Sequence, residues 1–228
     1  MKSLCLFFLS VILCALLPAQ SHEKSTKTSA PASGDPENCN VAFAGSARKA
    51  VKLRTASDGA GYSKVNDGNP IAVTDWFQMT CQLDKSVPAT VSATKPMQGL
   101  ETQEVKLRGF LVAAKLDADN DIHAELAGSA TWNTPHLIVE VPPGAEYCAA
   151  RKALWDIVKT ELPANSTSVI HVMQQPKEVE VTGYVFLDTA HGSTNFCHTS
   201  GGRGVKKQGV QKVQGLWEIH PVLDLKAL

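Results

Sequence analysis

Carboxylate and imidazole side chains recur side by side in this sequence, always within or at the end of a strand-like segment. In GLWEIHPVLDL, near the C-terminus, Glu218 and His220 are two residues apart among apolar neighbours. In a strand that spacing points both side chains to the same face. Because such a pair recurs, one face of the protein is a candidate functional site. The three pairs are Asp121 with His123, Asp188 with His191, and Glu218 with His220.

These residue types suit two kinds of chemistry. A neutral imidazole with carboxylate oxygens is a ligand set for Zn, Mn or Fe. A histidine beside a carboxylate is also the usual general base with its orienting partner. The candidate polar cluster comprises Asp119, Asp121, His123, Glu140, Asp188, His191, Glu218 and His220. If it binds a divalent metal, the candidate ligands are His123, His191, Glu218 and His220.

A purely structural interpretation of the same residues stays open. Asp119 and Asp121 could form a hairpin turn, and Asp188 and His191 could cap the loop after the fourth strand. His123 and His220 could be half-buried strand residues that hydrogen-bond backbone groups. No HExxH or GxSxG motif assigns a catalytic role.

Five segments with strand patterns and one with helical spacing must position these residues. The first two strands form a hairpin pattern that turns at DADND. Tyr147, Leu154 and Val158 lie at helical spacing. The expected strands cover 105–112, 121–128, 136–141, 177–188 and 215–225, and the expected helix covers 146–161.

The element order is therefore β-β-β-α-β-β, which predicts a mainly β protein with an OB-like five-stranded barrel. Gly109 and Gly183 fall in the middle of strands, where small barrels have bulges or tight bends. A β-sandwich is the alternative fold.

The N-terminus has the layout of a secretory signal. Lys2 is followed by an apolar run from Leu4 to Leu17 and by Pro18-Ala19, and the run is shorter than a membrane span. We therefore expect an exported protein, periplasmic or extracellular, with no transmembrane segment in the mature chain. The expected organisation is a signal peptide at 1–21, a flexible tether at 22–38, an irregular N-terminal extension at 39–100 and the barrel domain at 101–228.

Four cysteines remain after the signal, Cys39, Cys81, Cys148 and Cys197. An even number in an exported chain predicts two disulfides, for which three connectivities exist. We expect Cys39 to pair with Cys81 and Cys148 with Cys197. The absence of a CxxC pair argues against a zinc ribbon or a thioredoxin-type site.

The charge balance gives no strong nucleic-acid signal. Without Lys2 the chain has 21 basic and 22 acidic residues. The basic stretch at 201–212 is rich in glycine and indicates a solvated loop. The second strand offers no aromatic side chain for stacking bases. The binding partner is not specified by the sequence.

Several motifs together resemble a family of exported bacterial proteins of uncharacterised function. They are KLDADNDIHAEL, LIVEVPP…C, VEVTGYVFLDTAHG and WEIHPVLDL, within a resemblance that spans about Arg48 to Leu225. The family pattern carries a DxDxH hairpin, an IxEIPxP…C segment, an FFDxxHG strand and a terminal ELHPV strand. This chain departs from it at Leu187, where the pattern has Phe, and in a longer loop from Thr194 to Gly215. The resemblance implies export and an OB-like order, and it marks the same polar cluster with Gly192 and Pro221.

The sequence thus favours an exported OB-like domain that acts as a binding or accessory protein of the cell envelope. The alternative is a metal-dependent hydrolase of the phosphodiesterase or nuclease type that uses the clustered Asp, His and Glu side chains. A structural protein of the cell envelope is a third interpretation. The nuclease version would want arginines beside the carboxylates, and no arginine lies within those motifs.

Overall fold

The computed structural model describes residues 37–162, 169–191 and 216–228. The expected signal peptide and most of the tether lie outside these residues, as do Gly192, Cys197 and the basic stretch. The helices and 3-10 turns are α1 (Lys49–Lys52), η1 (Val65–Gly68), α2 (Val73–Asp84), η2 (Ala145–Tyr147), α3 (Cys148–Val158) and η3 (Thr189–His191). The strands are β1 (Ser63–Lys64), β2 (Ile71–Ala72), β3 (Gln103–Leu116), β4 (Ile122–Ala127), β5 (His136–Val141), β6 (His171–Leu187) and β7 (Trp217–Ala227).

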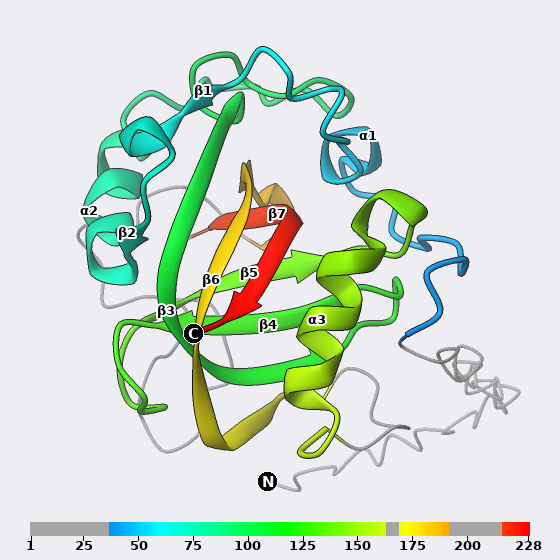
Figure 1. Ribbon diagram of the computed structural model, residues 1–228. Coiled ribbons are helices and arrows are strands. Elements are labelled where there is room, and N and C mark those ends of the chain that lie inside the picture. The colour runs from blue at the N-terminus through cyan, green and yellow to red at the C-terminus, as the bar shows by residue number, and fades with distance from the viewer. Residues whose placement is uncertain (1–36, 163–168, 192–215) are drawn as a thin grey trace, which may run out of the picture.

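The protein is mainly β, as the sequence predicts, and its sheet closes on itself (Figure 1). Strands pair in the order β3-β4-β5-β7-β6, and β6 pairs back to β3. All pairs in this ring are antiparallel except β5 with β7, which is parallel. The parallel pair needs a crossover connection, and α3 lies within the chain that makes it.

Alternation along the strands separates a core face from an outer face. In β4, Ile122, Ala124 and Leu126 join the hydrophobic core, so His123 and Glu125 between them point outward. In β7, Trp217 and Ile219 pack in the core, which places Glu218 and His220 on the other face. Helix α3 packs against β7 and β4 and contributes Leu154 and Val158 to the core.

Gly183 lies at a close approach between β6 and β7. The register between these strands shifts on both sides of Gly183. A Cβ atom there would lie 2.4 Å from the carbonyl oxygen of Pro221 and 2.5 Å from Cγ2 of Ile219. The expected bulge at Gly183 is therefore confirmed. At Gly109 a Cβ would lie 2.6 Å from Val73, but the register shift in β3 falls between Leu111 and Ala113.

The segment before residue 101 is more regular than the sequence predicts. It contains the 12-residue helix α2, and its strands β1 and β2 pair in parallel with β3. Val73 and Trp76 of α2 and Met97 belong to the same core as the ring. The expectation of an irregular extension is therefore wrong for this part of the segment. Helix α2 is stabilised by burying Val73 and Trp76 in the shared core, and local sequence patterns do not reveal such contacts between distant segments.

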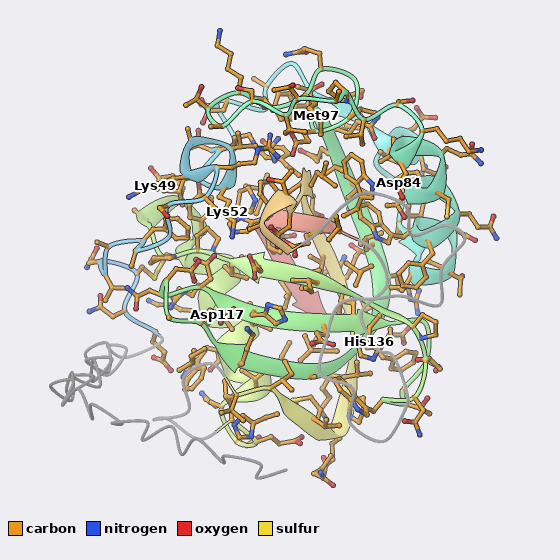
Figure 2. The ribbon with its side chains drawn as sticks, turned by 180° about the vertical axis from the view of Figure 1, so that it is seen from behind. Lys49, Lys52, Asp84, Met97, Asp117 and His136 are labelled. Carbon is orange, nitrogen blue, oxygen red and sulfur yellow. A yellow bond between two sulfur atoms is a disulfide. The ribbon has the colours of Figure 1, made fainter. Side chains whose placement is uncertain are left out.

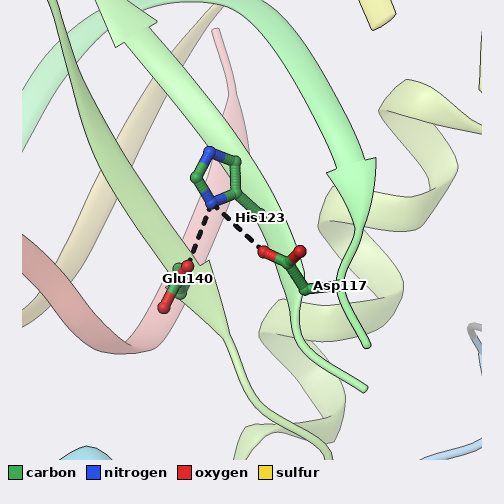
Figure 3. A group of neighbouring side chains, drawn as sticks. All are labelled: Asp117, His123 and Glu140. Carbon is green, nitrogen blue, oxygen red and sulfur yellow. Dashed lines mark hydrogen bonds and ion pairs between the residues drawn. The ribbon is translucent and has the colours of Figure 1, made fainter. Parts of the chain in front are cut away.

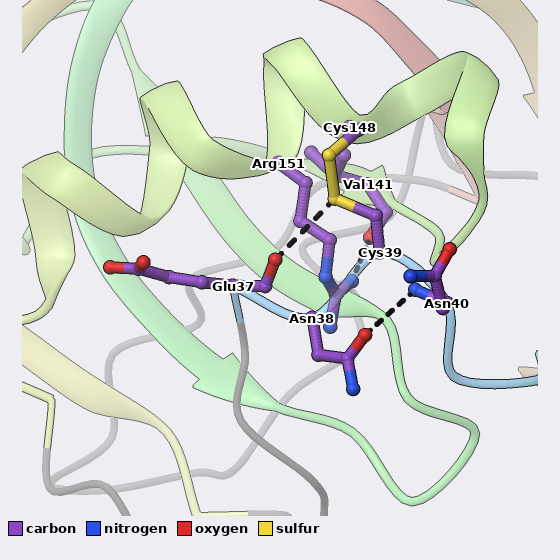
Figure 4. The surroundings of a disulfide bond; sticks show 7 residues. All are labelled: Glu37, Asn38, Cys39, Asn40, Val141, Cys148 and Arg151. Atoms are coloured by element: carbon purple, nitrogen blue, oxygen red, sulfur yellow. Dashed lines mark hydrogen bonds between the residues drawn. A yellow bond between two sulfur atoms is a disulfide. The ribbon is translucent and has the colours of Figure 1, made fainter.

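A disulfide joins the N-terminal segment to α3, and its connectivity differs from the expected one (Figure 4). Cys39 pairs with Cys148 at the start of α3, 109 residues away, and not with Cys81. The S–S bond fastens the N-terminal segment to α3. Beside it, Arg151 donates to the carbonyl oxygen of Val141 at 2.9 Å, which fixes α3 against the end of β5. Cys81 is also disulfide-bonded.

Within the part of the chain that the structure describes, every helix is too short or too polar to cross a lipid bilayer.

Candidate functional site

A row of three polar side chains crosses the outer face of β4, β5 and β7. His123 of β4 lies directly opposite Glu140 of β5 in the antiparallel register. Val139 pairs with Ile219 in the parallel register, so Glu140 neighbours His220 on the next strand. Nδ1 of His123 lies 3.0 Å from Oε1 of Glu140, and Nε2 of His220 lies 3.2 Å from Oε2. Glu140 thus uses one carboxylate oxygen toward each imidazole.

The turn between β3 and β4 brings two further carboxylates to this row. The amide of Asp117 donates to the carbonyl of Asp121 and Asn120 adopts a positive φ of 75°, which together close the hairpin. Oδ2 of Asp121 lies 3.0 Å from Nε2 of His220, and Oδ2 of Asp117 lies 3.6 Å from Nδ1 of His123. Asp119 instead turns toward the backbone amide of Asp121 within the hairpin.

The row continues in the other direction along β4 and β5. Nε2 of His123 lies 3.6 Å from Oε1 of Glu125, and the other oxygen of Glu125 contacts Nδ1 of His136. Nε2 of His136 lies 3.2 Å from the carbonyl oxygen of Trp132. Figure 2 shows Asp117 and Lys52 near one end of the β4–β5 pair and His136 near the other. Carboxylates and imidazoles therefore alternate across the whole face.

Lys52 of α1 brings an ammonium group to Glu140. Its Nζ lies 3.4 Å from Oε2 of Glu140. Burial lowers the pKa of Lys52, but the charges of Glu140, Glu218 and Asp121 raise it above its ordinary value. Lys52 is therefore cationic, and it balances one of several negative charges gathered at this point.

Two neighbouring carboxyl groups have opposite pKa shifts. Burial raises the pKa of Asp121 well above its usual range, and the charges of Glu140 and Asp119 raise it further. Burial also raises the pKa of Glu140. The hydrogen bond from His123 and the charge of Lys52 outweigh this effect and bring the pKa well below its usual range. Without a cation, Asp121 is thus the carboxyl group that takes up a proton.

The two imidazoles also differ. Burial lowers the pKa of His220 to about 3, so its ring is neutral. Burial lowers the pKa of His123 as well, but hydrogen bonds with Glu125 and Glu140 outweigh it and raise the pKa to about 9.

The structure brings together most of the predicted cluster. Contacts run in series from Asp121 to His220, from His220 to Glu140 and from Glu140 to His123. Asp119 and Glu218 lie close enough to influence Lys52 electrostatically. Asp188 has a capping role. Its Oδ1 accepts a hydrogen bond from the backbone amide of Ala190 at the start of η3. The side chain of His191 lies outside the described residues.

Sequence reasoning missed Lys52, Asp117 and His136, and it did not include Glu125 in the cluster. Glu125 follows His123 by two residues and His136 precedes Glu140 by four, so strand alternation places each pair on one face. That signal was available in the sequence. Lys52 had no such signal, because it reaches the site only through the packing of α1.

Two sets of ligand atoms in this site lie close enough together that each could hold a metal ion. One is Asp121, Glu140 and His220, all buried, and the other is Asp117, His123 and Glu140. Within each set the ligand atoms lie within 4.8 Å of one another. Bonds of about 2.1 Å place adjacent ligand atoms about 3.0–3.4 Å apart in octahedral or tetrahedral geometry. The distances of 3.0 and 3.2 Å around Nε2 of His220 fall in that range.

Comparison with protein-family models, with curated proteins and with solved structures finds no match for this chain.

Proposed function

We propose that this chain is an exported OB-type barrel that acts as a divalent-cation-binding accessory domain of the cell envelope. The ion is held by Asp121, Glu140 and His220. The oxygen and imidazole ligands suit Mn²⁺, Zn²⁺ or Fe²⁺.

The order of the ring supports the OB-type assignment. An OB barrel has five strands, with a helix between the third and fourth, and its ligands bind on the face of the second and third strands and the neighbouring loops. Here β4 and β5 occupy the second and third places in the ring, and α3 precedes β6. The candidate site lies on the outer face of β4 and β5 and in the β3–β4 turn. The resemblance in motifs to exported bacterial proteins agrees with this placement.

The Cys39–Cys148 disulfide supports export, because disulfides persist in oxidising compartments. The apolar run that follows Lys2 in the sequence agrees with it.

One observation carries the cation-binding proposal. Two buried carboxylates, from Asp121 and Glu140, converge on the same ring nitrogen of His220, at 3.0 and 3.2 Å. A neutral imidazole offers one proton at that nitrogen, which cannot fully satisfy both. Oδ1 of Asp121 is buried and has no hydrogen-bond partner among the described residues. Without a cation, burial of this arrangement therefore requires a proton on Asp121, and a bound cation would take the place of that proton.

The hydrolase alternative is less well supported. Catalysis of phosphoryl transfer wants cationic groups aimed at the developing charge. Three buried arginines serve other partners: Arg48 pairs with Glu101, Arg54 donates to backbone carbonyls and Arg151 donates to Val141. Among the described residues, Lys52 is the basic side chain that reaches Glu140.

The test is metal-dependent stabilisation of the mature protein. Purified protein is freed of metal with EDTA, and its melting temperature is measured with Mn²⁺, Zn²⁺ or Fe²⁺ added. A bound ion stabilises the folded state by mass action, by about 2.7 kcal/mol at a concentration 100 times the Kd. We expect a rise in melting temperature that His220→Ala abolishes.

His171→Ala is the matched control, because His171 pairs with Ala114 of β3 and is not one of the proposed ligands. It should keep the full response to metal. If no ion raises the melting temperature of the unaltered protein, the cluster is a structural hydrogen-bond network and the proposal is wrong.

A further inference from the structure

Glu140 offers its two carboxylate oxygens to two different ligand sets. Oε2 faces His220 and Lys52, whereas Oε1 faces His123 at 3.0 Å. Figure 3 shows His123 between Glu140 and Asp117, with Nδ1 directed at both carboxylates. The second ligand set therefore uses Oε1 of Glu140, whereas the first uses Oε2.

The two carboxylate oxygens of Asp117 also face different partners. Its Oδ1 accepts a hydrogen bond from Nζ of Lys115 at 2.7 Å, and its Oδ2 faces Nδ1 of His123 at 3.6 Å. Lys115 thus holds the carboxylate in place and leaves one oxygen directed at the site. Asp117 is also only partly buried, so this side of the cluster is open to solvent.

The far nitrogen of His123 is oriented as in a metal-binding histidine. Ligating histidines generally donate their other ring N–H to a carboxylate or carbonyl, which fixes the tautomer. Nε2 of His123 lies 3.6 Å from Oε1 of Glu125, and Glu125 is held by His136. His136 is held in turn by the carbonyl of Trp132. Nδ1 faces Asp117 and Glu140, so a cation bound there would displace the proton from Nδ1 and leave its lone pair as the ligand.

We propose that the site holds two divalent cations bridged by Glu140. The first ion is the one under the proposed function, bound by Asp121, Glu140 and His220, and this inference rests on it. The second is bound by Asp117, His123 and Oε1 of Glu140. Two-metal centres space their ions about 3.5–4 Å apart, a span that one bridging carboxylate covers.

The charge of the region agrees with two ions. Asp117, Asp119, Asp121, Glu140 and Glu218 gather around Lys52 and His123, and Lys115 pairs with Asp117. Carboxylates therefore outnumber ammonium groups. The second ion, at the partly exposed Asp117, is the one placed to meet a further anionic ligand from solvent.

The experiment counts ions. Metal-free protein is titrated with Mn²⁺ alone, and the stoichiometry is read by calorimetry and by elemental analysis after dialysis. We expect two ions in the unaltered protein, one in Asp117→Asn, one in Asp121→Asn and none in Glu140→Gln. Bridged Mn²⁺ ions couple magnetically, so the electron paramagnetic resonance spectrum of the unaltered protein should change to that of an isolated ion in Asp117→Asn.

The controls separate this inference from the proposed function. Asp156→Asn, on the exposed side of α3, should keep two ions. If the unaltered protein binds one ion and Asp117→Asn does not change that number, the second site does not exist while the first stands. If the unaltered protein binds none, both fall. His123→Gln should repeat the loss seen in Asp117→Asn, which guards against a folding defect in one variant.

Discussion

At the scale of single residues, neighbours decide the state of a side chain more than its type does. Asp121 and Glu140 are both buried carboxyl groups in one site, yet their pKa values shift in opposite directions. Glu140 faces His123 and Lys52, whereas Asp121 faces the neutral ring of His220. A cation bound between them would remove this asymmetry by displacing the proton from Asp121.

Arg48 and Glu101 form a fully buried ion pair that should dominate local stability. Their two hydrogen bonds measure 2.5 and 2.6 Å, and Glu101 also accepts from the amides of Met97 and Leu187. Glu101→Ala would leave the guanidinium buried without its partner. We expect a loss of about 3–5 kcal/mol in the free energy of unfolding, measured by urea denaturation.

Glu104→Ala provides the comparison for that prediction. Glu104 pairs with Lys64 at 3.8 Å on the surface, and such pairs contribute about 0–1 kcal/mol. Equal losses in the two variants would show that burial of the Arg48–Glu101 pair is energetically unimportant.

At the scale of elements, the crossing of β6 and β7 depends on the missing side chain of Gly183. Gly183→Ala would push a Cβ into the carbonyl of Pro221, which is backbone and cannot step aside. We expect destabilisation of about 1–3 kcal/mol, measured by urea denaturation. Gly61→Ala, where a Cβ meets nothing within 4 Å, should stay within about 0.5 kcal/mol. If Gly183→Ala does not change the free energy of unfolding, β6 and β7 can shift apart to make room for the Cβ at little cost, and the prediction is wrong.

The contact between β6 and the N-terminal segment should weaken at high pH. The hydroxyl of Tyr184 donates to the carbonyl of Thr55 at 3.1 Å. Burial, followed by the charge of Glu104, raises the pKa of Tyr184 to about 12, above its ordinary value of 10. The folded state therefore favours the protonated phenol. Its contribution to stability is complete below pH 10 and is lost as pH rises from 10 to 12.

Tyr184→Phe tests this sign. At pH 8 the variant should be less stable by about 0.5–1.5 kcal/mol, the usual contribution of one hydrogen bond. The difference in urea midpoint between the two proteins should then shrink between pH 10 and 12, since phenylalanine does not titrate. A difference that stays constant over this range would contradict the raised pKa.

At the scale of the whole molecule, the N-terminal segment is part of the same folding unit as the ring. Arg54 donates to the carbonyls of Val185 and His220, so this segment ties two strands of the ring together. The Cys39–Cys148 disulfide closes a chain segment of 109 residues. Its removal in a Cys39→Ser, Cys148→Ser double variant should cost about 4–5 kcal/mol in the loop-entropy model.

Calorimetric unfolding of the double variant measures that cost. We expect one cooperative transition at a lower temperature, because the segment still packs on the core through Val73 and Trp76. An unchanged melting temperature would show that this disulfide does not constrain the unfolded chain, and two separate transitions would show that the N-terminal segment folds alone.

Local patterns in the sequence are enough to place most of the elements from about residue 101 onward. The alternation of Ile122, Ala124 and Leu126 with His123 and Glu125 specified β4 and the face of each residue. The same pattern placed Glu218 and His220 opposite Trp217 and Ile219, because side-chain direction in a strand follows from backbone geometry alone.

Local patterns do not reveal which of these faces meet in the folded protein. The partners of His220 are Asp121, 99 residues away, and Glu140, and both depend on β7 lying beside β5 in the closed ring. Lys52 and the Cys39–Cys148 connectivity depend on where the N-terminal segment packs. Four cysteines allow three pairings, and the sequence does not distinguish between them. Local periodicity likewise gives no information about contacts between distant segments. Those contacts are set by burial of the shared core, which is a property of the folded chain as a whole.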